Sequence, residues 1–296
     1  MLEKVDFDKK MISKEEYKAK MPQMEIELGR LQRECRELKI PVMIVFEGFG
    51  ASGKGVQIGK LIQSMDPRGF QVFPIKAETE DERMHPFLWR FWTKTPEAGR
   101  IAIFDGSWYR KVLIDRFEKR TREKEIETAF HSIEAFEKQL TDGGTILVKL
   151  LLDIDQKEQK KRFEKLLEKK ETAWRVSQGD RERNAKYSEY AAMMEEVLYR
   201  SDTKSAPWTV IEATDRRFAT VKIYMTVIHA LAEAVEAVQR RRMEEQAIKA
   251  AEQVSGQQEA AEIMRQAGGE LEMLQSSVLS RADLTLAYGK EEYEKD

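Results

Sequence analysis

The sequence predicts an α/β protein in which helices cover both faces of a parallel β-sheet. Five short apolar runs alternate with longer helical patterns, as in chains made of successive strand–helix–strand units. The runs that begin at residues 42 and 145 are almost uninterrupted, which is typical of strands buried on both faces. Ligands of such sheets bind at the carboxyl ends of the strands, so residues that follow a strand are the first candidates for function.

The five predicted strands are bounded by turn signals. Pro41 precedes the first, the turn Asp66-Pro67-Arg68-Gly69 precedes the second, and Pro207 introduces the last. We expect strands from residue 42 to the glycine-rich loop, and at 70–76, 100–105, 145–152 and 208–213.

Helical patterns fill the intervals. Residues 14–39 place apolar side chains at three- and four-residue spacing, which makes one stripe of Met21, Met24, Leu28, Leu31, Cys35 and Leu38. Cys35 is the only cysteine, and its place in the stripe indicates packing rather than nucleophilic chemistry. Further helices are expected at 54–65, 81–93, 123–140, 156–170 and 215–243.

Composition narrows the class of function. The 296 residues include 35% charged side chains but carry a net charge of −2, so no overall basic field favours nucleic-acid binding. No segment is interpreted as long and apolar enough to cross a membrane, and the residues after Met1 do not resemble a signal peptide. The three histidines show no metal-ligand spacing. We therefore expect a cytoplasmic protein without nucleic-acid or membrane partners.

The strongest functional signal is the stretch VMIVFEGFGASGKG at residues 42–55. Gly48, four residues, Gly53 and Lys54 have the spacing of a phosphate-binding P-loop, in which glycines let backbone N–H groups face phosphate oxygens. Lys54 adds a cation, and the following helix adds its positive end. Gly55 stands where the motif has the Ser or Thr that holds Mg²⁺. The alternative is an ordinary glycine turn followed by a surface lysine.

Phosphoryl transfer also needs a metal-holding carboxylate and further cations. Asp105 follows the third apolar run, where a Walker-B aspartate would hold Mg²⁺, although it could instead cap a helix that starts near Ser107. Several basic residues could form anion pockets or be plain surface charges: Arg68, Arg83, Arg90, Arg110 and Lys111.

Two further segments differ in composition from the rest. Residues 171–205 are dense in charge and lie where a nucleotide kinase has a mobile lid, although composition alone also fits a solvated helical excursion. The tail after residue 243 is polar, and its composition predicts a helical linker. In it, Lys290-Glu291-Glu292-Tyr293 repeats Lys14-Glu15-Glu16-Tyr17, which suggests that a second copy of the domain would begin there.

Seven motifs, in this order along the chain, resemble the family-2 polyphosphate kinases. They are EGFGASGKG (47–55), DPRGF (66–70), LWRFW (88–92), GRIAIFDGSWY (99–109), FEKQL (136–140), EQKKRF (158–163) and SAPWTVIEA (205–213). The resemblance runs from about residue 15 to residue 240. It is closest to the polyphosphate:AMP phosphotransferase branch, whose members carry two such domains in tandem.

The resemblance implies a P-loop kinase fold akin to thymidylate kinase, a three-layer α/β/α sandwich with a helical lid. It implies phosphoryl transfer between inorganic polyphosphate and an adenine nucleotide, AMP or ADP, with Mg²⁺. By position, Gly48, Gly53, Lys54 and Gly55 match the Walker-A loop, where glycine after the lysine is a family trait, and Asp105 matches the Walker-B aspartate. Trp174, Arg175 and Asp180 fall in the lid. Arg68 and Lys111 are expected to bind phosphate.

The chain departs from the family pattern at the site itself. The family loop typically reads G-x-D-x-A-G-K-G, whereas Gly50 and Ser52 replace its aspartate and alanine here. Gly106 replaces an arginine after Asp105, and Lys111 replaces a further one. Arg175 stands where lysine is usual.

The absence of these side chains predicts that this chain is the catalytically degraded half of a tandem enzyme. The alternatives are a structural or polyphosphate-binding pseudo-enzyme domain and an ATP-dependent nucleoside monophosphate kinase. The expected partner besides substrate is a second copy of the domain, in the same chain or as a homo-oligomer. We expect a helical extension at 1–40, a kinase-like domain at 41–243 with its lid at 171–205, and a linker at 244–296 that leads into the second repeat.

Overall fold

The computed structural model describes residue 2, residues 11–252 and residues 262–270. Its centre is a five-stranded sheet in the order β2-β3-β1-β4-β5, and every neighbouring pair is parallel. The strands are β1 (Val42–Gly48), β2 (Phe70–Pro74), β3 (Ile101–Asp105), β4 (Ile146–Asp153) and β5 (Trp208–Glu212). The predicted α/β fold is confirmed. The strand that leads into the glycine-rich loop, β1, lies in the middle of the sheet.

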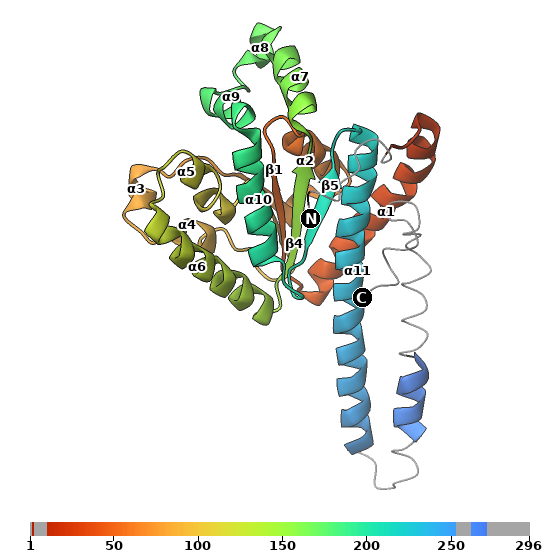
Figure 1. Cartoon of the computed structure of the whole chain (residues 1–296). Helices are drawn as coiled ribbons and strands as arrows, with labels where there is room; N and C mark the ends of the chain where they lie inside the picture. The colour runs from red at the N-terminus through yellow and green to blue at the C-terminus, as the bar shows by residue number, and fades with distance from the viewer. Residues whose placement is uncertain (1, 3–10, 253–261, 271–296) are drawn as a thin grey trace.

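Helices cover both faces of the sheet (Figure 1). One layer contains α1 (Lys14–Leu38), α2 (Lys54–Gln63) and α11 (Arg216–Glu252), because α11 contacts α1, α2, β4 and β5. The other layer contains α6 (Glu123–Asp142) and α10 (Tyr187–Ser201), and α6 contacts β4. The short helices α3 (Glu80–Arg83), α4 (Trp89–Trp92) and α5 (Ile114–Phe117) lie on the same side of the sheet as α6. The 3-10 turn η3 (Trp108–Lys111) contacts α5 and α6.

Three helices project beyond the carboxyl ends of the strands, at the top of Figure 1. They are α7 (Gln156–Leu167), α8 (Lys170–Ala173) and α9 (Gln178–Ala185). The segment expected to be a lid, 171–205, therefore has two parts. Its first part belongs to this projection, whereas α10 buries Tyr190, Met194, Val197 and Leu198 in the core. The 3-10 turn η2 (Pro67–Gly69) leads into β2, so it lies at the amino ends of the strands, opposite the projecting helices.

The core follows the apolar runs of the sequence. Residues 42–46 of β1 have no exposed surface, as expected for a central strand covered on both faces. The α1 stripe is buried at Met21, Leu28, Leu31 and Cys35. This helix packs along α11, so Cys35 is a packing residue as predicted.

Two sequence expectations were wrong in detail. Residues 81–93 do not form one helix: α3 and α4 are separate, because Pro86 disfavours helical geometry in the residue before it. The expectation that no segment could cross a membrane was wrong, because residues 216–251 of α11 are long and apolar enough to do so by length and composition alone. However, 78% of the apolar window is buried inside the fold, as in a core helix. The second tetrapeptide copy, at 290–293, lies outside the described residues.

Candidate functional site

The glycine-rich loop joins the end of β1 to the start of α2. Gly48, Ala51 and Gly53 have φ angles of 138°, 59° and 105°, so the loop turns through left-handed conformations that favour glycine. A Cβ atom at Gly48 would lie 2.2 Å from the carbonyl oxygen of Leu152 in β4. The loop therefore leaves the sheet between two closely packed strands, and Gly48 is required there for space as well as for conformation.

Two side chains of α7, Gln159 and Arg162, donate hydrogen bonds to backbone carbonyls of the loop. Gln159 Nε2 donates to the Gly50 carbonyl at 3.0 Å. Arg162 Nη1 donates to the carbonyls of Ala51 and Ser52, both at 3.1 Å. Its other terminal nitrogen, Nη2, donates to the carbonyls of residues 213 and 214 after β5, at 2.8 and 3.0 Å. Sequence reasoning quoted the motif EQKKRF but assigned these residues no role.

Lys54 is the first residue of α2, and its ammonium group turns back over the loop. Nζ donates to the carbonyl oxygens of Gly48 at 2.8 Å and Phe49 at 3.3 Å. The N-terminal end of α2 carries the positive end of the helix dipole, and its fully described first turn contains no acidic residue. The carboxyl ends of the strands thus bring together the Lys54 ammonium group, the glycine backbone of the loop and the positive N-terminal end of α2. Such a combination is typical of a phosphate-binding site.

Two carboxylates lie beside the loop. Asp105 ends β3, where it pairs in register with Phe46 of β1, and Glu47 is the next residue of β1. The Glu47 side chain is buried and accepts a hydrogen bond of 2.7 Å from Ser107 Oγ. Burial raises the pKa of Glu47, the Ser107 hydrogen bond and the charge of Lys54 oppose this, and the charge of Asp105 adds to it. The charges of Lys54 and Asp105 thus both lie close enough to influence the Glu47 carboxyl group.

Glu47 was missed in the sequence as a candidate. The available signal was an acidic residue at the end of an otherwise apolar strand, directly before a phosphate loop. Within residues 11–252 and 262–270, no group of three or more His, Cys, Asp or Glu side chains is arranged to hold a metal ion. The carboxylate oxygens of Asp105 and Glu47 suit a hard cation that takes its other ligands from water and substrate.

The lid rests on the loop at Gly50. A Cβ atom there would lie 2.9 Å from Asp180 Oδ1 of α9. Asn184 Nδ2 of the same helix donates to Gln159 Oε1 at 2.8 Å, and Gln159 in turn holds the Gly50 carbonyl. The ring of Phe49 stacks on Tyr187 with 4.9 Å between centroids. These contacts bring α9 and the start of α10 directly against the loop.

The other predicted lid residues do not reach the loop. Trp174 is 75% exposed, and its indole N–H donates to the Glu171 carbonyl within the lid itself. Arg175 stacks over the same ring at 5.4 Å. Of the three predicted lid residues, the structure brings only Asp180 to the loop.

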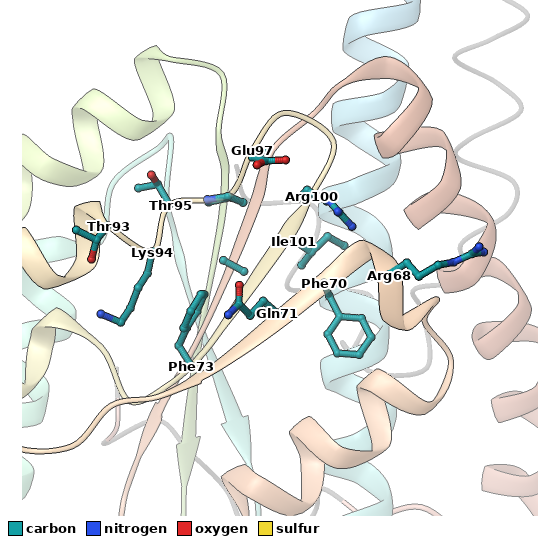
Figure 2. A pocket seen from close by; sticks show the side chains of 12 residues that line it. Arg68, Phe70, Gln71, Phe73, Thr93, Lys94, Thr95, Glu97, Arg100 and Ile101 are labelled. Carbon is teal, nitrogen blue, oxygen red and sulfur yellow. The ribbon is translucent and has the colours of Figure 1, made fainter.

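Lys111 and Arg68 occupy different edges of the sheet. Lys111 follows β3 in η3, on the edge that carries the loop, and its Nζ lies 5.8 Å from the centroid of the Phe87 ring. Arg68 precedes β2, so it lies at the amino ends of the parallel strands. There it is paired with Asp66 at 2.8 Å and lines a cavity of about 350 Å³ with Arg100 and Glu97 (Figure 2). The structure therefore does not bring Arg68 to the phosphate loop.

Gly106 has a φ of 75°, and its N–H donates to the Phe46 carbonyl at 2.9 Å. A Cβ atom there would have room, with its nearest neighbour 3.7 Å away at the carbonyl of Ile75. Gly106 therefore keeps β3 in contact with β1 at the site through a backbone conformation that other residues adopt at a cost.

The fold and the loop place the chain in the class of P-loop kinase-like α/β proteins. A family model described as Polyphosphate kinase 2 (PPK2) matches residues 11–241. The chain therefore belongs to the polyphosphate kinase 2 family.

Relatives of known name and structure agree with this assignment. A polyphosphate:AMP phosphotransferase of Pseudomonas syringae pv. tomato is 37% identical over 223 residues, which are 75% of this chain and 45% of the relative. An NDP-polyphosphate phosphotransferase 3 of Ruegeria pomeroyi is 31% identical over 225 residues, 76% of this chain and 74% of the relative. The crystal structure of a putative polyphosphate kinase 2 from Pseudomonas aeruginosa is similar with a TM-score of 0.75 and 35% identity. That match covers 79% of this chain and 50% of the other. The chain thus spans less than half the length of the first of these relatives.

Proposed function

We propose that this domain binds inorganic polyphosphate at the loop and takes part in phosphoryl transfer between polyphosphate and AMP, within a longer tandem enzyme. The observation that carries the proposal is the arrangement of Lys54, the glycine-rich loop and the Asp105–Glu47 pair at one edge of the sheet. The names of the relatives supply the substrates, polyphosphate and AMP. A cytoplasmic location is part of the same proposal.

Each group has a role that follows from its chemistry. The α2 N-terminus and Lys54 would bind the phosphate oxygens, and Lys54 would exchange its two carbonyl partners for them. Asp105, with Glu47 beside it, would hold Mg²⁺. When bound, Mg²⁺ neutralises charge on the transferring phosphoryl group. Asp180 of the lid lies next to the loop at Gly50.

We further propose that the catalytic power of this domain is reduced. Gly50 and Gly106 offer no side chain where the family has a carboxylate and a guanidinium. Each loss of this kind costs about a hundredfold in rate, from removal of one group that stabilises transition-state charge. Binding depends on the loop and Lys54, so it should survive these losses. The competing proposal is a domain that binds polyphosphate without any turnover.

The test combines binding with turnover. The chain is mixed with Mg²⁺, long-chain polyphosphate and AMP, and ADP formation is measured beside calorimetric binding of polyphosphate. We expect binding that Lys54→Ala abolishes, with ADP formation well below that of a full-length relative. Turnover equal to the relative would contradict the reduced activity, and no binding would contradict the whole proposal. Replacing polyphosphate by ATP separates the remaining candidate, because a nucleoside monophosphate kinase would use ATP instead.

A further inference from the structure

The cavity of Figure 2 is separate from the phosphate loop. It has a volume of about 350 Å³, within the range of small-molecule sites, and lies at the amino ends of β2 and β3. Its floor is the face of β2 from which Gln71 and Phe73 rise, and its wall is residues 93–97, in the segment that joins α4 to β3. The phosphate loop leaves the opposite end of the sheet, so a molecule in this cavity would not displace one at the loop.

One end of the cavity is cationic. In the register of β2 and β3, Phe70 lies opposite Ile101, so Arg68 and Arg100 precede neighbouring strands at nearly the same level. Arg68 is paired with Asp66 at 2.8 Å, although its side chain is 81% exposed. Among the described residues, the exposed Arg100 guanidinium has neither an ion-pair partner nor a hydrogen-bond partner. This end therefore offers an arginine whose planar set of donors is available to a phosphate group.

The other end of the cavity is aromatic and polar. Phe73 is half-buried: its ring packs against Phe104 with 5.3 Å between centroids, and the rest of it lines the cavity. Gln71 lies two residues earlier on the same face of the strand and is exposed, and its amide can both donate and accept hydrogen bonds. An aromatic face with an amide beside it is a typical surface for stacking a nucleobase and bonding to its edge.

The two ends are separated by about the length of a nucleotide. Arg100 is level with the start of β2, and Phe73 lies three residues beyond Phe70, which is about 10 Å along the strand. In the view of Figure 2, the Glu97 carboxylate lies between these two ends. Glu97 is exposed and has no ion-pair partner among the described residues, so its oxygens can accept hydrogen bonds from hydroxyl groups.

We propose that this cavity binds a nucleoside monophosphate at a site distinct from the phosphate loop. Arg100 binds the phosphate, Glu97 accepts from the ribose hydroxyls, and Phe73 stacks on the base while Gln71 bonds to its edge. The carboxylate of Glu97 disfavours a longer run of phosphates, which would bring further negative charge beside it. The proposal goes beyond the proposed function and does not depend on it, because no group of the loop takes part.

Hydrogen–deuterium exchange localises the binding, because it reports protection separately for each peptide of the chain. AMP, adenosine and inorganic phosphate are added separately to the wild type and to Lys54→Ala, which lacks the loop cation. We expect AMP to slow exchange at residues 69–73 and 93–100 equally in both proteins. Adenosine and inorganic phosphate should protect these residues much less, because each lacks one half of the recognised molecule.

Substitutions in the cavity test the assigned contacts. Arg100→Gln removes the phosphate-binding cation, and Arg241→Gln makes the same charge change at an exposed position of α11 outside the cavity. The AMP concentration for half-maximal protection should rise about tenfold in Arg100→Gln, through loss of a charge-assisted hydrogen bond, and stay unchanged in Arg241→Gln. Phe73→Leu should raise it about fivefold by removing the stacking face. Gln71→Ala makes a parallel test on an exposed side chain, with a rise of about threefold.

The outcomes separate this site from the loop. The proposal is overturned if AMP protects neither segment, if Lys54→Ala abolishes the protection, or if Arg100→Gln and Arg241→Gln have equal midpoints. Equal protection by inorganic phosphate and AMP would also overturn it, because the cavity would then recognise only an anion. Polyphosphate binding and ADP formation test the loop instead, so a failure of the proposed function in those assays leaves this site standing.

Discussion

Replacing Gly50 by aspartate tests how the lid is seated on the loop. The Cβ atom of a side chain at Gly50 would lie 2.9 Å from Asp180 Oδ1 and 3.1 Å from Phe163 Cζ. Asp180 is charged at neutral pH: burial opposes ionisation, but hydrogen bonds from Ser177 and Arg183 hold its pKa below the ordinary value. A carboxylate at position 50 would therefore face a second carboxylate.

The size of the effect follows from Coulomb's law. Two like charges about 5 Å apart repel by about 3 kcal/mol at an effective dielectric constant of about 20. Arg183, which donates to Asp180 at 2.8 Å, offsets part of this, and α9 can move away from the loop. We expect Gly50→Asp to lower the free energy of unfolding by about 1–2 kcal/mol more than Gly50→Asn does.

Urea unfolding of three variants checks the reasoning. Gly50→Asn has nearly the same volume without the charge, and Gly50→Asp/Asp180→Asn removes the repulsion while keeping the new carboxylate. The difference between the Asp and Asn variants should shrink at about 1 M salt, where charges are screened beyond about 3 Å. Equal losses in both variants at low salt would refute the contact between Asp180 and the loop. If the contact is confirmed, attempts to restore activity with Gly50→Asp need Asp180→Asn beside it.

Three further predictions concern stability. Burial and the Glu212 carboxylate raise the pKa of Asp153 to about 7. The protonated side chain therefore stabilises the fold fully at pH values below the ordinary aspartate pKa, and this stabilisation is lost as the pH rises through 7. Relative to Asp153→Asn, the wild type should lose about 2 kcal/mol of unfolding free energy between about pH 5 and pH 7, and equal pH profiles would contradict this. Arg162→Lys should lower the free energy of unfolding in urea by about 2 kcal/mol or more, because one ammonium group cannot reach both the loop carbonyls and those after β5. A decrease below about 0.5 kcal/mol would show that Arg162 does not hold the loop. Gly48→Ala should cost at least about 3 kcal/mol or prevent folding, because its Cβ would meet a backbone carbonyl. Gly55→Ala, which has open space and helical geometry, is its control and should be neutral or slightly stabilising in thermal unfolding.

The sequence predicted the parts of the fold that depend on local patterns. Short apolar runs bounded by turn signals predicted all five strands, and the glycine spacing located the loop at the end of β1. The break at Pro86 was also readable, since the residue before a proline avoids helix, yet the aromatic density of 81–93 outweighed it in the prediction.

The candidate site was predicted less completely, because it depends on strand direction and on distant contacts. Arg68 was expected to bind phosphate, but a residue that precedes a parallel strand lies at the edge opposite the loop. Gln159 and Arg162 act on carbonyls more than 100 residues away in sequence, at separations of 109 and 111 residues. No local pattern reports such pairs. The hydrogen bond to Glu47 likewise comes from Ser107, which lies 60 residues away in the loop after the neighbouring strand.

The contacts behind the loop decide which way its peptide groups point. None of the described peptide bonds is cis, and in a trans peptide the N–H is directed opposite to the carbonyl. Gln159 and Arg162 draw the carbonyls of Gly50 and Ser52 towards α7, so the N–H groups of Ala51 and Gly53 must face the other way. The donors of the anion site are thus aimed before any ligand arrives. Substitutions of Gln159 or Arg162 should therefore alter phosphate affinity, because the loop dipoles would lose their fixed orientation.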